Sequence, residues 1–192
     1  MSIFSETKLA LPNNGLPYNT AISHTSEMPI VAVMSQNCVL FYDENGDILD
    51  FKLERYKNFP KTRQFDPSVL DWHPKMPILA IGWTSGAVTL VNMKSKRPKE
   101  ESNYHQSPIL KLQYNENGDR MCTVDQDGNI AIWKDMNCLQ VFEKHCEVTS
   151  MTSASMVIQR KNKAPKNLNL FFIGGKDGKF HFANPRDCVV RQ

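Results

Sequence analysis

Three residue types that enzymes combine for nucleophilic catalysis occur close together in the middle of the 192-residue chain. They are the imidazole of His105, the hydroxyl of Thr123 and the carboxylate of Asp127. In hydrolases such groups serve as base, nucleophile and orienting acid, but that chemistry also needs a nucleophile on a sharp turn and an oxyanion glycine motif. The sequence has neither. We therefore favour a structural set, completed by the indole of Trp133, and we predict a non-enzyme without catalytic, metal or cofactor sites.

The segment that carries this set, residues 105–135, has the pattern of short strands joined by turns. The turn before the last strand contains Asp127-Gly128, a pair that tolerates the positive φ of a hairpin. Strands linked in this way make up most of one propeller blade. The apolar runs are residues 109–112, 121–124 and 130–133.

The same order of apolar runs and turns occurs four times along the chain. The turn residue that opens the third strand of each unit recurs at intervals of about 40–50 residues, which is the length of a propeller blade. These residues are Asn37, Gly86, Gly128 and Gly178. The pattern predicts an all-β chain that forms about four blades of a seven-bladed β-propeller.

The predicted blades lie within one domain, residues 1–192, and span residues 18–53, 68–94, 105–142 and 145–190. An apolar stretch at residues 3–12 has no partner strand beside it in the sequence, so we expect it to complete the last blade. Seven blades need more residues than this chain has. We expect the first part of a longer propeller, or one that another chain completes, because open repeat arrays expose apolar surface.

The other three units lack the complete polar set. Ser85 stands at the place of Asp127 in the second unit, and Ile173 and Ala183 flank the Asp177-Gly178 turn of the fourth. We expect apolar packing to hold these blades. His73, which has no second ligand at usable spacing for a metal, is expected to form local hydrogen bonds at a strand end.

Composition narrows the classes of function. The net charge of +3, from 23 basic and 20 acidic residues, is too small to indicate nucleic-acid binding. The chain has five cysteines, an odd number, and none of them form a C-x-x-C pair. Both facts argue against a disulfide framework or a zinc site and indicate a reducing compartment. Neither a signal-peptide pattern nor an apolar run of about 18 residues occurs. These features predict a soluble, intracellular protein. The cysteines are Cys38, Cys122, Cys138, Cys146 and Cys188.

Basic residues cluster in two short segments, residues 94–99 and 160–166. We interpret Lys94–Glu101 as a solvated linker between blades, and residues 160–167 as a solvated hairpin loop. An acidic partner or a membrane surface is the alternative for the second segment. Basic residues interleaved with aromatic ones at 54–67 would suit single-stranded nucleic acid, although a loop packed on its blade is favoured.

The residues from Trp72-His73-Pro74 through Ile78–Asn92 carry a family resemblance. They resemble the second blade of the WD40–TPR core subunits of the intraflagellar transport A complex. In WD40 repeats a Ser/Thr–His–Asp–Trp set is a hydrogen-bonded structural network, which implies this role for His105, Thr123, Asp127 and Trp133. The chain departs from the repeat in having Lys134-Asp135 after the tryptophan rather than an aspartate directly.

The resemblance implies a scaffold that supports retrograde ciliary transport and the import of ciliary cargo. The implied partners are other subunits of the complex and cargo proteins, at the cilium and ciliary base, with peripheral membrane association as a further contact and no nucleic acid. The alternative is a WD40 adaptor or vesicle-coat subunit in membrane trafficking. Residues that bind partners are not identified by the sequence.

Overall fold

In the part of the chain that the structure, a computed structural model, describes, the regular secondary structure consists of β-strands joined by turns and short loops. The described residues are 19–23, 29–35, 37–56, 64–101, 104–143, 146–160, 163–184 and 189–191. Within them, 17 strands form four antiparallel sheets, in which spatial neighbours are also sequence neighbours. The strand predicted at residues 3–12 lies outside the described residues.

Each sheet is a meander of four or five strands. The first contains β1 (Asn19–Ile22), β2 (Val31–Ser35), β3 (Cys38–Tyr42), β4 (Ile48–Tyr56) and β5 (Gln64–Phe65). The second contains β6 (Pro67–Trp72), β7 (Ile78–Trp83), β8 (Val88–Asn92) and β9 (Arg97–Glu101). The third contains β10 (Ile109–Tyr114), β11 (Met121–Asp125), β12 (Asn129–Lys134) and β13 (Asn137–Glu143). The fourth contains β14 (Val148–Arg160), β15 (Lys163–Gly175), β16 (Phe180–Asn184) and β17 (Val189–Arg191).

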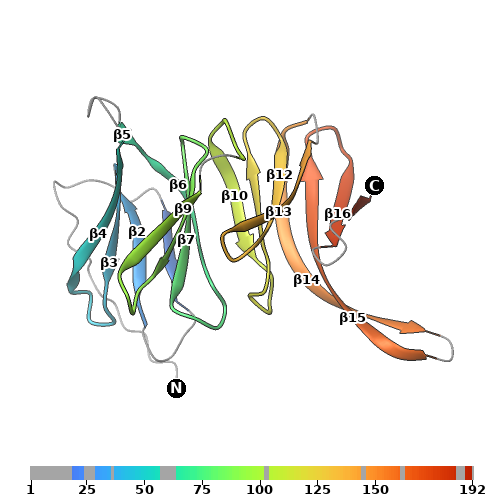
Figure 1. The fold of residues 1–192 in the computed structure, drawn as a ribbon, viewed down its shortest axis with the longest axis horizontal. Coiled ribbons are helices and arrows are strands. Elements are labelled where there is room, and N and C mark those ends of the chain that lie inside the picture. The colour runs from blue at the N-terminus through green and yellow to red at the C-terminus, as the bar shows by residue number, and fades with distance from the viewer. Residues whose placement is uncertain are drawn as a thin grey trace, which may run out of the picture.

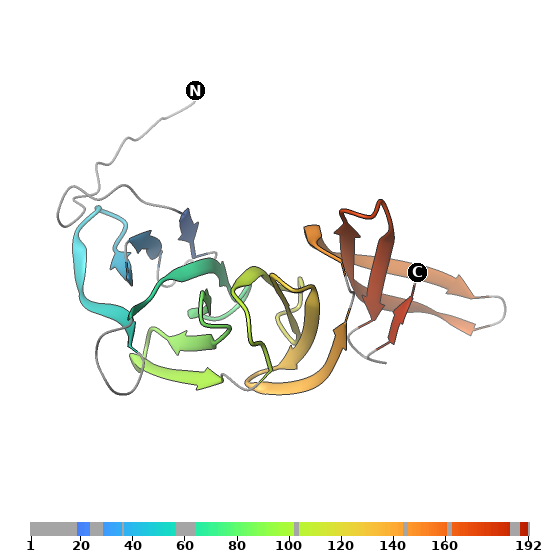
Figure 2. The same ribbon diagram turned by 90° about the horizontal axis from the view of Figure 1, so that it is seen from above.

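The sheets stand next to one another in chain order (Figure 1), and seen from above they follow an open arc rather than a closed ring (Figure 2). Such face-to-face succession of four-stranded meanders is the architecture of propeller blades. The predicted fold class, a partial β-propeller, is therefore confirmed.

Apolar side chains fill the spaces between successive sheets, and the central strand β7 shows how one strand serves two of these cores. Leu79 and Ile81 pack in the core shared with the first sheet, whereas Ala80 packs in the core shared with the third. Side chains alternate across a strand, so a strand between two sheets must be apolar on both faces. This requirement explains the dense apolar run Ile78–Trp83.

The four turn residues that defined the repeat all have left-handed backbone conformations. Their φ angles are 71° at Asn37, 86° at Gly86, 86° at Gly128 and 74° at Gly178. At two of them the turn also lies against the chain entering the next sheet. A Cβ on Gly86 would be 2.4 Å from the His105 carbonyl oxygen, and one on Gly128 would be 2.5 Å from that of Cys146.

Two segments differ from their predicted form. The expected linker Lys94–Glu101 contains β9, the outer strand of the second sheet, after a tight turn closed by the Lys96 amide donating to the Asn92 carbonyl at 2.8 Å. The expected loop at residues 160–167 belongs mostly to a long hairpin, because β14 runs to Arg160 and β15 begins at Lys163. The sequence that forms β9 and the sequence at 160–167 are both rich in polar and charged residues. Neither segment therefore shows the apolar alternation that identifies a half-buried strand.

Candidate functional site

The polar set predicted in the third sheet is a continuous chain of buried hydrogen bonds. The Trp133 indole N–H donates to Thr123 Oγ1 at 2.7 Å, and Thr123 Oγ1 lies 2.7 Å from His105 Nε2. His105 Nδ1 lies 2.9 Å from Asp125 Oδ2. The structure thus brings together His105, Thr123 and Trp133, and the carboxylate that joins them is that of Asp125.

Asp127, which we expected to supply this carboxylate, lies in the exposed turn instead. Its backbone N–H donates to Asp125 Oδ1 at 3.0 Å. The end of the strand explains the correction. Thr123 and Asp125 are two residues apart on β11 and project from the same face toward His105, whereas Asp127 lies beyond the last residue of the strand. The Asp127-Gly128 pair was the signal in the sequence that separates the two aspartates, because such a pair marks a turn, where the strand has ended.

Asp125 also organises the turn that follows it. Besides His105, its two oxygens accept the backbone N–H of Asp127, the backbone N–H of Asn129 at 2.8 Å and the Asn129 side-chain amide at 2.9 Å. A carboxylate with this many donors needs no water to be satisfied when buried. The residue therefore couples the tight Gln126–Gly128 turn to the strand core.

The hydrogen-bond chain indicates where the proton of His105 lies. A carboxylate only accepts, so Nδ1 must carry the proton, and the hydroxyl of Thr123 then donates to an unprotonated Nε2. Burial lowers the pKa of His105 more than Asp125 raises it, which favours this neutral form. Every polar atom of the set has a partner with its role assigned from the indole to the carboxylate.

The set is sealed from solvent. His105, Thr123, Asp125 and Trp133 have exposed fractions of 1%, 0%, 1% and 1%. A catalytic nucleophile and its base must contact the substrate. In this conformation no substrate can reach the side-chain atoms of these four residues. The arrangement can do one thing chemically: it satisfies buried donors and acceptors, and in doing so it ties the segment that leads into β10 to β11 and β12.

The other sheets have different residues at the positions equivalent to Asp125 and Trp133. In the second sheet Trp83, which replaces Asp125 in the repeat register, donates its indole N–H to Thr89 Oγ1 at 2.9 Å. In the first and fourth sheets, the positions equivalent to Trp133 hold Tyr42 and Ala183, both buried. The first and fourth sheets thus carry no copy of the His105 network among the residues described.

Hydrogen bonds between the first strands of neighbouring sheets hold the blades in register. Both backbone groups of Tyr114 on β10 take part: its N–H donates to Asp71 Oδ2 of β6 at 2.7 Å, and its carbonyl accepts from Ser153 Oγ of β14 at 3.2 Å. On the other side of the second sheet, the Trp72 indole donates to the Ala21 carbonyl of β1 at 3.0 Å. The first strands of all four sheets are thereby linked.

His73 caps the end of β6, as the sequence predicted. Its Nδ1 accepts from the backbone N–H groups of Lys75 and Met76, each at 3.0 Å. Its ring packs on Gly118 of the third sheet, where a Cβ would lie 2.3 Å from the imidazole. Burial lowers the pKa of His73, so the neutral ring is favoured here too.

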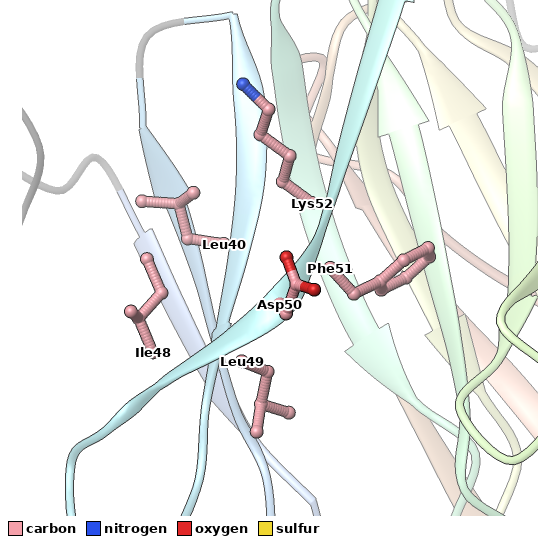
Figure 3. A pocket seen from close by; sticks show the side chains of 6 residues that line it. All are labelled: Leu40, Ile48, Leu49, Asp50, Phe51 and Lys52. Atoms are coloured by element: carbon pink, nitrogen blue, oxygen red, sulfur yellow. The ribbon is translucent and has the colours of Figure 1, made fainter.

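A surface hollow of about 540 Å³ lies along β4. Leu40 of β3 and five consecutive residues of β4, Ile48 to Lys52, line it. Figure 3 shows these side chains directed to different sides of β4 rather than toward one centre. Phe51 stacks on Phe41 at 5.4 Å, and the Lys52 ammonium pairs with Glu54 at 2.6 Å. The hollow thus lacks the convergent polar groups of a ligand site.

Within the ranges that the structure describes, no three His, Cys, Asp or Glu side chains are grouped as metal ligands would be. A helix long and apolar enough to cross a bilayer is likewise not found in those ranges.

The comparison with protein families agrees with this architecture. The family model described as the IFT140 first beta-propeller matches residues 2–168 of the 192-residue chain. The match covers the first three sheets and the first two strands of the fourth up to Leu168. Most of the chain, including the whole buried network, is therefore accounted for by one family model, and the chain belongs to the IFT140 first β-propeller family.

Proposed function

We propose that this chain is a non-enzymatic scaffold and interaction module of the intraflagellar transport A complex, supporting retrograde ciliary transport and the import of ciliary cargo. The observation that carries the proposal is the family match over residues 2–168. The vesicle-coat or adaptor alternative has no comparable observation in its favour.

The geometry supports a binding role rather than a chemical one. His105, Asp125 and Thr123 are the side chains that could most readily act as catalytic groups, but they are hydrogen-bonded to one another in the buried network. Exposed strand edges and the loops at the ends of the sheets are what the molecule presents to others, and propellers bind proteins through such surfaces. Other subunits of the complex and ciliary cargo proteins are the proposed partners, with peripheral membrane contact secondary.

We further propose that the chain acts at the cilium and ciliary base, as a soluble protein delivered from the cytoplasm. Live imaging of the fluorescently tagged chain in ciliated cells tests this. The proposal expects tagged particles that travel from the ciliary tip toward the base. Exclusion of the folded, tagged chain from cilia, with accumulation on vesicles instead, would favour the coat alternative.

A further inference from the structure

The hairpin of β14 and β15 is longer than the sheet to which it belongs. The two strands pair from Val148 opposite Gly175 to Arg160 opposite Lys163, whereas β16 pairs with β15 only at Phe171–Gly174. The outer part is therefore a two-stranded ribbon, which Figures 1 and 2 show projecting away from the sheets. We call residues 156–160 and 163–168 the arm.

The root of the arm is fastened to the third sheet. Ser153 Oγ donates to the Tyr114 carbonyl, and Ser155 Oγ donates to the Glu116 carboxylate just beyond β10. Just past this root, the side chains of Met156 and Val157 are 45% and 62% exposed. The arm thus projects from a fastened root and presents these two apolar side chains to solvent.

Charge in the arm is of one sign. From Val148 through Lys176 the sequence contains no acidic residue, although the whole chain is nearly balanced at +3. In the backbone register of the ribbon, Arg160 is the partner of Lys163 and Ile158 is the partner of Lys166. Concentrated positive charge at the end of a projection attracts acidic partners.

The backbone of the arm offers an edge for strand pairing. In the described part of the chain β14 is the end strand of its sheet, and β15 has no second neighbour in the arm. The β15 edge carries Lys163, Pro165 and Lys166, residue types that discourage pairing. The β14 edge from Ser153 to Gln159 carries no lysine or proline, so it is open to an added strand.

We propose that the arm docks an acidic, extended segment of a partner protein. The segment adds as a strand to the β14 edge at Met156–Gln159, and its carboxylates meet Arg160, Lys163 and Lys166. A two-stranded ribbon is only marginally stable alone, and a third strand would complete it. The inference goes beyond the proposed scaffold role and holds whichever complex the chain joins.

An anionic membrane surface fits the arm less well. A segment that inserts into a membrane buries its apolar side chains deeper than its basic ones, which stay at the level of the headgroups. Here the order is reversed, since Met156 and Val157 lie at the root side and the basic positions lie toward the tip. Lipid also cannot pair with the backbone groups of a strand edge.

The test measures binding of the whole 192-residue chain to a fluorescein-labelled decapeptide of alternating Glu and Thr, by fluorescence polarisation. The arm variant is Arg160→Glu/Lys163→Glu/Lys166→Glu. Its matched control, Lys94→Glu/Arg97→Glu/Lys99→Glu, reverses one arginine and two lysines on the exposed β8–β9 hairpin. We expect the arm variant to bind about tenfold more weakly, because three ion pairs with the peptide are lost, and the control to bind within about twofold of the unmodified chain.

The strand pairing is tested without altering the protein by measuring the affinity of a Glu–Thr peptide that is N-methylated at alternate residues. It keeps its charge and loses donors along one edge, so we expect it to bind about fivefold more weakly than the unmethylated peptide. Equal affinity of the two peptides would overturn the strand pairing. Equal weakening by both triple variants, or binding to phosphatidylserine vesicles without binding to the Glu–Thr peptide, would overturn the acidic-segment docking.

Discussion

At the scale of single residues, the buried network of the third sheet depends on which of two nearby aspartates faces the strand core. Asp125 accepts from His105, from two backbone amides and from Asn129, whereas Asp127 lies in the exposed turn. Losing a buried acceptor leaves all its donors unpaired, which costs far more than losing an exposed carboxylate.

Replacement of these aspartates should therefore have very different effects. We expect Asp125→Ala to lower the free energy of unfolding by about 3–5 kcal/mol, and Asp127→Ala to change it by about 0.5 kcal/mol or less. Urea denaturation followed by tryptophan fluorescence measures both. Similar losses for the two variants would show that the network is not organised by Asp125.

Two of the buried histidines, His105 and His73, make stability depend on pH. Burial lowers the folded-state pKa of His105 and of His73 from the ordinary value of 6.5, so below about that pH the unfolded chain binds more protons than the folded one. Stability contributed by the neutral rings is present above pH 6.5 and is lost as the pH falls toward the lowered folded values.

We expect the urea midpoint to fall between pH 7.5 and pH 5.5, and to fall less steeply in His73→Asn, which retains an acceptor for the turn amides. Denaturation at a series of pH values provides the measurement. A midpoint independent of pH over this range would contradict neutral, buried histidines.

At the scale of elements, much of the sheet pattern could be predicted because the blade cores demand apolar strands and left-handed turns. The run Ile78–Trp83 is a strand as predicted, and Asn37, Gly86, Gly128 and Gly178 all have positive φ. What could not be predicted lies at the exposed outer edge. β9 is formed by Arg-Pro-Lys-Glu-Glu, which carries no burial signal and pairs because β8 offers it an edge.

The buried network, too, could be predicted only in part from the sequence. The family pattern supplied His105, Thr123 and Trp133, but the choice between Asp125 and Asp127 depended on where β11 ends. The contacts of Tyr114 with Asp71 and Ser153 join residues far apart in sequence, so no local pattern could have indicated them.

The turn that contains Gly118 packs against His73 of the second sheet, and this contact can be tested by comparing two glycines that have similar φ angles. Gly118 and Gly178 have φ of 77° and 74°, but an added Cβ meets the His73 ring at Gly118 and meets nothing within 4 Å at Gly178. We expect Gly178→Ala to cost about 1 kcal/mol from backbone strain alone, and Gly118→Ala to cost about 2–4 kcal/mol because overpacking adds to the strain.

The control is the same substitution in a His73→Ala background, where the clash is absent. There the cost of Gly118→Ala should fall to that of Gly178→Ala. An unchanged cost in that background would mean that His73 does not contact this turn.

At the scale of the whole molecule, four sheets act as one body because each interface has an apolar core and the first strands are cross-linked by hydrogen bonds. Such a body has rigid faces and one projecting arm, which suits a protein that positions partners. Because propellers support many functions, it is the family that links this scaffold to intraflagellar transport.

The most direct measurement is quantitative mass spectrometry of proteins that co-purify with the tagged chain from ciliated cells, beside tag-only cells and cells expressing Asp125→Ala. The account predicts that subunits of the intraflagellar transport A complex are enriched with the unmodified chain and are lost when Asp125→Ala disrupts the fold. If the unmodified chain is folded and brings down no such subunit above the tag-only level, the proposed scaffold role is contradicted.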